Sequence, residues 1–449
     1  MSKPFLRVVT PHQARSLLAA FEPLESEEVS LAEGPFRVLS ESIIASEDTP
    51  GFDRSTMDGF AVRSVDTFGS TESAPGLFRV VDEVQMGEIR DLSLGRGEAA
   101  RIWTGGALPL GADAVIMVEH TQDLGSDSIE ILKAAAPFEN VVRRGEDFRA
   151  GEVLLEMGHR LRPQDLGLLA AMGRPRVTVF RKPSVAIVSS GDEIVPVEQD
   201  PPPGCMRDVN RHTMHASVVE AHGIPVWIGI AQDRLDVLAE MIDRGLSCAD
   251  MVVISGGSSM GSRDFVIEAI ESYPSSEIIL HGVSVSPGKP LILARVGRKP
   301  VLGLPGHPAG AMVCFEQFAV PIMRRLGGED VTHPYMRPAI EAYLARNVPS
   351  REGRMDFVRV RLHFSDDRLT ATPVPGKSGM ISAMVRAHGY ICIAQDCEGL
   401  YKGDRVKVHL FASWGEEGIE KEYLFGHEVA GGSSGALFEA YSQERLSQQ

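Results

Sequence analysis

Two long apolar runs that end in small residues lie in the middle of the chain. The first reads PSVAIVSSGDEIV over residues 183–195, and the second reads ADMVVISGGSSMG over residues 249–261. Helical segments are expected between them, near residues 211–221 and 234–244. Strands that are buried on both faces and alternate with helices are typical of a parallel sheet. The pattern therefore predicts a three-layer α/β domain over residues 180–326.

The segments before this domain follow other patterns. Residues 10–21 (TPHQARSLLAAF) predict a short amphipathic helix, since Thr10 suits an N-cap and Pro11 suits the first helical position. A helix followed by a strand is expected over residues 161–180. Residues 30–146 contain short β-like runs broken by Gly, Pro and Asp, which predicts a β-rich domain.

The C-terminal part of the chain alternates between apolar and polar residues with period two. Over residues 327–411 this alternation predicts a small β-barrel or sandwich. Residues 412–449 are acidic and rich in Gly and Ser, so we expect a flexible tail. The predicted fold class is therefore multi-domain, α/β plus β.

Composition narrows the functional classes. The 449 residues carry a formal net charge of -16, which argues against a nucleic-acid surface, because phosphate binding depends on clustered Lys and Arg. The five cysteines are far apart and form no CxxC pair, so neither a disulfide framework nor a zinc site is expected. The start MSKPFLRVVT lacks the apolar core of a signal peptide, and no segment resembles a membrane span. We expect a soluble cytoplasmic protein without nucleic-acid or membrane partners. The negative net charge does not exclude a small anionic substrate, provided that positive charge is concentrated locally.

Two loops follow the buried strands, at the edge where open α/β sheets bind ligands. In SSGDEI, Asp192 and Glu193 follow a glycine at a strand end. In SGGSSMGSRD, Gly256 and Gly257 would let backbone N–H groups approach an anion. An ordinary tight turn with a solvated carboxylate is the alternative for either loop. Neither loop has the glycine spacing of a Rossmann or P-loop nucleotide site.

Two turns that contain prolines offer further candidates. In SPGKPLIL, Pro287 and Pro290 hold Lys289 as a candidate anion contact, and a solvated lysine in a rigid turn is the alternative. In GLPGHPAGAMVCFEQF, a turn leads into an apolar helix from about Ala309, whose first N–H groups are free. We interpret His307 as a hydrogen-bonded structural residue rather than a catalytic base, because the sequence shows no partner for it.

Seven motifs, in order along the chain, resemble those of the molybdopterin molybdenumtransferase family, whose relatives include the E domain of gephyrin. They are PGFDRSTMDGFAV, TGGALPLGADAVIMVE, VVRRGEDF, SSGDEIV, SGGSSMGSRDF, SPGKP and GLPGHP. The resemblance implies a homodimer whose subunit has a split linker domain, a β-rich insert, a molybdopterin-binding domain, a C-terminal β-barrel and a tail, at residues 1–29 with 147–179, 30–146, 180–326, 327–411 and 412–449. It implies a transferase of molybdenum cofactor biosynthesis that inserts molybdate into adenylylated molybdopterin and releases AMP with Mg²⁺. Other proteins of this biosynthesis are further expected partners.

The resemblance also assigns roles to residues at matching positions. Catalytic roles are implied for Asp58, Glu193, Asp264 and Lys289. Substrate contacts are implied for Thr104, Asp147, Asp208, Gly256, Gly257, Ser259, Pro290, Arg359 and Ser378. Glu193, Asp233 and Asp264 would surround Mg²⁺, which proteins usually hold by one or two carboxylates together with substrate phosphates. Asp58 and Thr104 would reach the cleft of the partner subunit.

The resemblance implies that Arg359 and Ser378 contact the oxyanion. Arginine suits a tetrahedral oxyanion because its donors are planar and always charged. An exposed strand arginine and a turn serine are the alternative for these two. Two departures from the family pattern concern the same oxyanion. Ser286 stands where the family usually has a basic residue, and Gly310 stands where it usually has a serine. Besides the molybdate-inserting enzyme, a paralogue specialised for tungstate and a non-inserting pterin-binding or scaffold protein therefore stay open.

Overall fold

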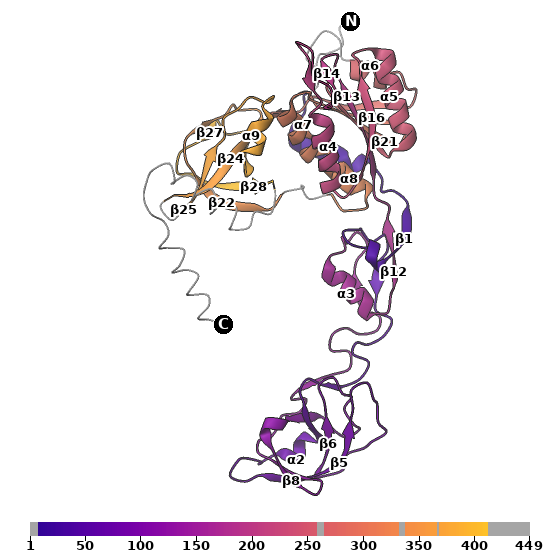
Figure 1. Ribbon diagram of the computed structural model, residues 1–449, viewed down its shortest axis with the longest axis vertical. Coiled ribbons are helices and arrows are strands. Elements are labelled where there is room, and N and C mark those ends of the chain that lie inside the picture. The colour runs from indigo at the N-terminus through magenta and orange to yellow at the C-terminus, as the bar shows by residue number, and fades with distance from the viewer. Residues whose placement is uncertain (1–7, 258–264, 332–336, 366–367, 412–449) are drawn as a thin grey trace. The chain divides into compact units, whose positions relative to one another are not determined.

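The computed structural model describes residues 8–257, 265–331, 337–365 and 368–411. The chain forms two compact units (Figure 1). One of them, here called the β-rich unit, comprises Glu28–Val179. The other, here called the main unit, comprises the residues before and after it.

The main unit contains a six-stranded sheet in the order β16-β13-β17-β21-β20-β18. The two apolar runs form its central strands β13 (Ser184–Ser190) and β17 (Met251–Ser255), which pair in parallel with Ser189 opposite Ser255. β21 (Lys299–Leu304) continues the parallel arrangement beside β17. The α/β prediction is confirmed.

The predicted parallel pairing holds for β16, β13, β17 and β21, whereas one edge of the sheet is antiparallel. β20 (Ile292–Val296) runs antiparallel to both β21 and β18 (Ser276–His281). β20 and β21 are joined by a turn too short to hold a crossover helix, so these two strands can pair only in antiparallel fashion. At the other edge, the sequence analysis assigned no strand to β16 (Ile224–Ala231). Its Pro225 is tolerated because an edge strand has one unpaired side.

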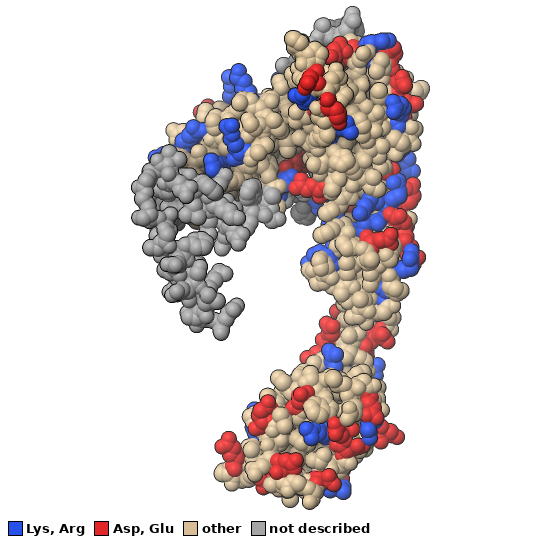
Figure 2. Space-filling view, in the orientation of Figure 1, with Lys and Arg blue, Asp and Glu red and all other residues tan. Residues whose placement is uncertain are grey.

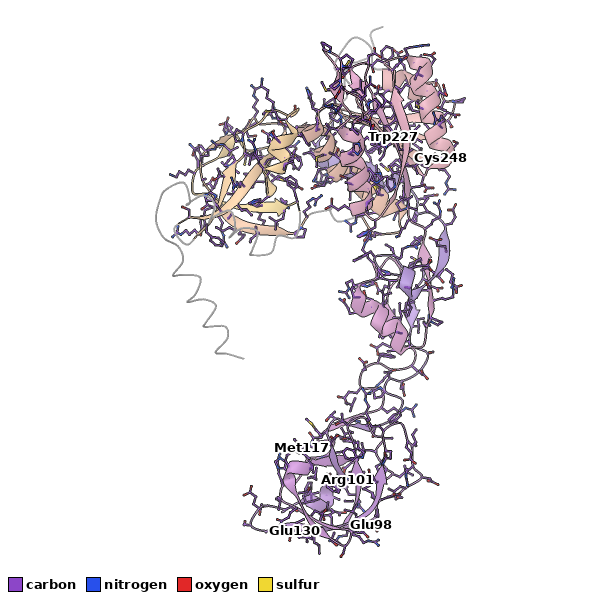
Figure 3. The ribbon with its side chains drawn as sticks, in the orientation of Figure 1. Glu98, Arg101, Met117, Glu130, Trp227 and Cys248 are labelled. Carbon is purple, nitrogen blue, oxygen red and sulfur yellow. The ribbon has the colours of Figure 1, made fainter. Side chains whose placement is uncertain are left out.

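Helices cover both faces of this sheet, which makes the domain three-layered. α4 (Asn210–Glu220), α7 (Pro308–Cys314) and α8 (Val320–Leu326) pack on one face, where Ile187 and Val253 point. α5 (Leu235–Cys248) and α6 (Phe265–Glu271) pack on the other face, where Val188 and Ile254 point. Figure 3 labels Trp227 on β16 and Cys248 at the end of α5. The helices predicted near residues 211–221, 234–244 and from about Ala309 are thus confirmed.

The N-terminal helix α1 (Pro11–Ser16) begins with a capping box. The Thr10 Oγ1 accepts the Gln13 N–H at 3.2 Å, and the Gln13 Oε1 accepts the Thr10 N–H at 3.0 Å. These two bonds satisfy donors that a helix start leaves free. Leu18 and Phe21, which follow α1, are buried in the core of the main unit, so the predicted amphipathic helix is confirmed.

The C-terminal part of the main unit is a closed barrel rather than a sandwich. Its strands are β22 (Ala339–Leu344), β24 (Met355–Ser365), β25 (Arg368–Pro373), β26 (Gly389–Ile393) and β28 (Arg405–Leu410). The pairing of β24 with β26 closes the sheet on itself. The short strand β19 (Val285–Ser286) pairs in parallel with the start of β24, with Ser286 opposite Asp356. The SPGKP segment is therefore hydrogen-bonded to the barrel.

The β-rich unit contains another six-stranded sheet, in the order β7-β4-β6-β5-β9-β8. The central strands are β6 (Glu98–Ile102) and β5 (Gly76–Val84). The flanking strands are β7 (Ala114–Met117), β4 (Gly59–Val62), β9 (Ser128–Ile131) and β8 (Thr121–Gly125). α3 (Pro163–Ala171) is followed by β12 (Arg176–Phe180), as predicted. Among the helices of the described ranges, none is long and apolar enough to cross a membrane.

Candidate functional site

The two predicted loops begin side by side, because β13 and β17 are paired up to their carboxyl ends. Gly256 has φ +96°, and a Cβ there would come within 2.1 Å of the Ser190 carbonyl oxygen. Only glycine allows this close approach. The Gly256 N–H donates to the Leu304 carbonyl at 3.1 Å, so an anion at this loop has to use other donors. Ser259 and Asp264 lie outside the described residues.

Carboxylates gather at the ends of β13 and β16. The Asp233 Oδ1 accepts the Ser190 hydroxyl at 3.0 Å, and the Asp233 N–H donates to the Asp192 Oδ1 at 3.1 Å. The Glu193 carboxylate folds back towards Gly191, where an added Cβ would lie 2.8 Å from the Glu193 Oε2. No group of three acidic, His or Cys side chains in the described residues forms a complete metal cage. Mg²⁺ usually binds one or two carboxylates together with substrate phosphate. The strand-end carboxylates Glu193 and Asp233 therefore fit that ion.

Buried polar atoms without partners surround the start of α4. Asp208 is 3% exposed; its Oδ1 accepts the Arg211 N–H at 3.0 Å, and its Oδ2 has no hydrogen-bond partner among the described residues. Asn210 donates to the Ser255 Oγ at 2.9 Å and to the Gly306 carbonyl at 2.8 Å, whereas its Oδ1, like the Ser189 Oγ, has none in this part of the chain. Buried polar atoms are normally hydrogen-bonded, so these three are candidate ligand contacts. Nothing in the sequence had singled out Asn210.

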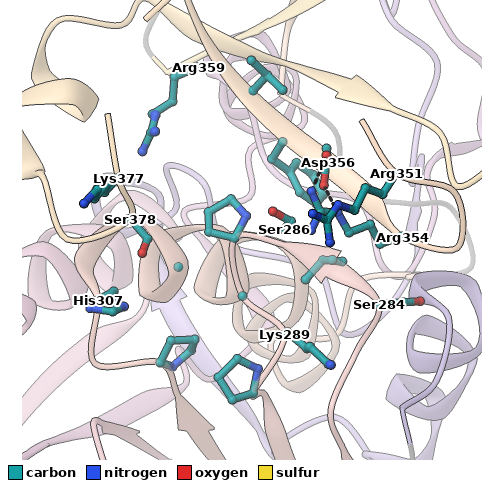
Figure 4. A pocket seen from close by; sticks show the side chains of 18 of the residues that line it. Ser284, Ser286, Lys289, His307, Arg351, Arg354, Asp356, Arg359, Lys377 and Ser378 are labelled. Carbon is teal, nitrogen blue, oxygen red and sulfur yellow. Dashed lines mark hydrogen bonds and ion pairs between the residues drawn. The ribbon is translucent and has the colours of Figure 1, made fainter. Parts of the chain in front are cut away.

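A larger cavity of about 1270 Å³ lies between the SPGKP segment and the barrel (Figure 4). Four of the predicted site residues line it, namely Lys289, which was assigned a catalytic role, and the substrate contacts Pro290, Arg359 and Ser378. The Ala309 N–H donates to the Ser378 carbonyl at 3.1 Å, which joins the start of α7 to the barrel segment. The structure thus brings together residues that lie almost 90 positions apart in the sequence.

Most of the positive charge on the cavity wall is not neutralised by a carboxylate of the described residues. Lys289 and Lys377 form no ion pair or side-chain hydrogen bond with any described residue. Arg359 donates from Nη2 to the Gly376 carbonyl at 2.6 Å, while its buried Nε has no partner. Burial lowers the pKa of Arg359 from its ordinary value. Arg354 is different, because its Nε lies 2.8 Å from the buried carboxylate of Asp356. Figure 2 shows basic side chains gathered on the face of the barrel.

Both departures from the family pattern fall in this one cavity. Ser286 and Gly310 line it together with Lys289. His307 also lines it, and its side chain is exposed and without a hydrogen bond from any described residue, so the hydrogen-bonded structural role finds no support. The oxyanion side of the predicted site therefore differs from the family pattern in two of its lining residues.

In the β-rich unit, Asp58 and Thr104 meet at the surface. The Asp58 Oδ1 accepts the Thr104 N–H at 2.7 Å and the Thr104 hydroxyl at 2.8 Å. The Thr104 backbone N–H, followed by its hydroxyl, lowers the pKa of Asp58, so this carboxylate is held ionised. Asp147 is exposed, and its N–H donates to the Thr49 carbonyl at 3.1 Å. The structure pairs Asp58 with Thr104 as candidate residues, whereas no hydrogen bond joins Asp147 to either of them.

Three parts of the chain match known families. Residues 9–173 match the MoeA N-terminal region (domain I and II), residues 186–325 a probable molybdopterin binding domain, and residues 341–411 the MoeA C-terminal region (domain IV). The chain is also 33% identical over 390 residues to the molybdopterin molybdenumtransferase of Bacillus subtilis, which covers 86% of this chain and 90% of that relative. The chain belongs to the molybdopterin molybdenumtransferase (MoeA) family. The resemblance based on the seven motifs is confirmed.

Other members of the MoeA family agree with this assignment. The molybdopterin molybdenumtransferase of a Nostoc species is 36% identical over 307 residues, which is 68% of this chain and 70% of that relative. A crystal structure of a Pyrococcus MoeA protein gives a TM-score of 0.75 at 36% identity and covers 91% of this chain and 100% of its own. Within this MoeA fold, the structure adds three basic residues to the cavity that the sequence analysis did not select, namely Arg351, Arg354 and Lys377. The only signal for them was their closeness in sequence to MDFVRV and to Ser378.

Proposed function

We propose that this protein inserts molybdate into adenylylated molybdopterin in molybdenum cofactor biosynthesis, with Mg²⁺-dependent release of AMP. The family carries the assignment to molybdenum cofactor biosynthesis and to the transferases. The observation that supports oxyanion chemistry in this chain is the cavity of about 1270 Å³, which Lys289, Arg359 and Ser378 all line although they come from distant segments. Charged N–H donors and a hydroxyl suit a tetrahedral oxyanion, because each of its oxygens accepts hydrogen bonds.

The strand-end loops of the main unit supply the second half of the proposed chemistry. In this proposal Asp208, Asn210 and Ser189 offer buried hydrogen-bonding atoms to the pterin nucleotide. Glu193 and Asp233, with Asp264, would hold Mg²⁺, which when bound neutralises phosphate charge. The hydrogen bond from Ser190 to Asp233 keeps one of these carboxylates oriented. The chain's own residues thus position the adenylate, while Lys289 and Arg359 hold the oxyanion.

We further propose that the active form is a homodimer in which Asp58 and Thr104 of one subunit act on the substrate of its partner. The double hydrogen bond from Thr104 fixes the Asp58 carboxylate and keeps it ionised, which suits a residue that acts at an exposed position. We place the protein in the cytoplasm, and its five free cysteines support a reducing compartment. Further proteins of cofactor biosynthesis are proposed partners for substrate delivery.

The test is AMP release by the purified protein given adenylylated molybdopterin, Mg²⁺ and molybdate. We expect AMP and molybdenum cofactor in equal amounts, and no AMP when the oxyanion is left out. Absence of AMP with molybdate and with tungstate would refute the proposal.

A second candidate function is a pterin-binding protein with an altered oxyanion pocket, or one specialised for tungstate. The observation that favours it is that Ser286 and Gly310 both line the cavity of Lys289. Molybdate and tungstate compared side by side separate the two oxyanions. A large gain of insertion activity in the double variant Ser286→Lys, Gly310→Ser supports a wild-type protein that binds the pterin without inserting the metal. An unchanged activity supports a wild-type enzyme whose oxyanion pocket is altered.

A further inference from the structure

The loop between β23 (Val348–Pro349) and β24 is held at both of its ends. The Ser350 N–H donates to the Glu398 carbonyl at 2.7 Å, and the Ser350 hydroxyl donates to the Asp356 Oδ2 at 2.9 Å. The Gly353 N–H donates to the Gln395 carbonyl at 2.7 Å. Arg351 lies between these anchors, so its backbone is fixed although its side chain is exposed.

Arg351 lines the cavity of Lys289 and Arg359, and its guanidinium forms no ion pair or hydrogen bond with any described residue. The adjacent Arg354 behaves differently, since the buried Asp356 carboxylate neutralises it. The other carboxylate of the wall, Glu352, is exposed and binds none of the described cations. An arginine on a fixed loop without a counterion is prepared to bind an anion, because its donors need not first leave another partner.

Arg351 lies on the side of the cavity where the family's usual basic residue is replaced by Ser286. Ser286 lies opposite Asp356 in the β19–β24 pairing, and Asp356 in turn accepts from both Ser350 and Arg354. Figure 4 shows Arg351 on the same side of the cavity as Ser286, whereas Arg359, Lys377 and Ser378 lie across from them. The cavity therefore retains a cation on the side where the sequence departs from the family pattern.

We propose that Arg351 is an oxyanion-binding residue that supplies the positive charge absent at Ser286. The inference rests on the proposed function and concerns the same cavity. It makes this chain a molybdate-binding member of its family with the basic residue moved from the SPGKP segment to the barrel loop. A basic residue at position 286 is then not required, because Arg351 already supplies a positive charge on that side of the cavity.

The experiment measures molybdate binding by equilibrium dialysis and the KM for molybdate in AMP release, both with the full-length chain. Arg351→Gln should raise the dissociation constant and the KM about tenfold to a hundredfold, the loss expected for one hydrogen bond to a charged group. The kcat at saturating molybdate should change little, because the adenylate contacts stay intact. Arg351→Lys should keep part of the affinity, which a purely structural role would not predict.

Arg386→Gln is the matched control, because Arg386 is an exposed arginine of the barrel region that does not line the cavity. It removes the same charge and should change the KM less than twofold. Adding Ser286→Lys to Arg351→Gln should restore most of the affinity, since the cation returns to the same side of the cavity. An unchanged KM in Arg351→Gln, or an equal effect of Arg386→Gln, overturns the inference.

The outcomes separate this inference from the proposed function. If the wild-type protein binds molybdate but releases no AMP, insertion is refuted, and the dissociation constant of Arg351→Gln still decides the role of Arg351. If the wild type releases AMP and Arg351→Gln matches it in both measurements, only the inference fails. If the wild type binds neither molybdate nor tungstate, both fail.

Discussion

Replacing Gly256 by alanine is expected to damage the α/β domain more than an ordinary substitution at a glycine of positive φ. The backbone of Gly256 has φ +96°, a conformation that costs an L-residue about 1–2 kcal/mol. The added Cβ would also lie 2.1 Å from the Ser190 carbonyl oxygen, well inside the 3.0 Å below which Cβ contacts are essentially never seen. The ends of β13 and β17 would have to separate, and such overpacking typically costs about 1–3 kcal/mol more.

The matched control is Gly297→Ala, in the turn between β20 and β21 of the same sheet. Gly297 has φ +60° and no atom within 4 Å of an added Cβ, so only the conformational cost of about 1–2 kcal/mol applies. Urea unfolding followed by circular dichroism should give Gly256→Ala a loss of about 2–5 kcal/mol. Moving Ser190 should also disturb its hydrogen bond to Asp233, so AMP release should fall at temperatures where the variant is folded. Equal destabilisation in the two variants would show that the Ser190 contact contributes nothing.

Three further predictions concern the proposed site. Thr104→Val should raise the pKa of Asp58 towards its usual value of about 3.9 without reaching it, because the Thr104 N–H remains as a donor; NMR titration of the carboxyl carbon measures this. Asp58→Asn and Lys289→Met should each abolish AMP release, and mixing the two variants should restore part of it if one subunit completes the site of the other; inactive mixtures argue against a shared site. Chelation of divalent cations should stop AMP release and Mg²⁺ should restore it, whereas activity that survives chelation contradicts a role for the cation.

The sequence predicted the central strands well because their residues are buried on both faces. A continuous apolar run such as Met251–Ser255 has few other structures available once it ends in two glycines. β16 was not predicted, because Pro225 and Gly229 interrupt its run of apolar residues. An edge strand tolerates both residues. The antiparallel β20 could not be anticipated from composition, because the direction of a short strand depends on the length of its connection.

The candidate site was predictable only where a motif carries its own chemistry. Lys289 could be selected from the sequence because two prolines hold it in a rigid turn, whereas no local motif distinguishes Arg351 from the other arginines. What distinguishes Arg351 is the anchoring of its loop by Glu398 and Gln395, which are over 40 residues away in sequence. Asn210 is similar, because its partners Ser255 and Gly306 become neighbours only after the sheet has formed. Contacts of this kind depend on tertiary structure, and no local pattern encodes them.

The negative net charge of the protein is compatible with a small anionic substrate, because only charges close to the cavity act strongly on a bound anion. Charges separated by more than about 8 Å are largely screened at physiological ionic strength. The carboxylates spread over the rest of the chain therefore weaken the field in the cavity much less than their number suggests. Lys289, Arg351 and Arg359 act on that cavity directly, with Lys377 beside Ser378. The net charge of -16 thus argues against a long polyanion, which needs cations over a wide surface, and leaves room for a small oxyanion held by a few side chains.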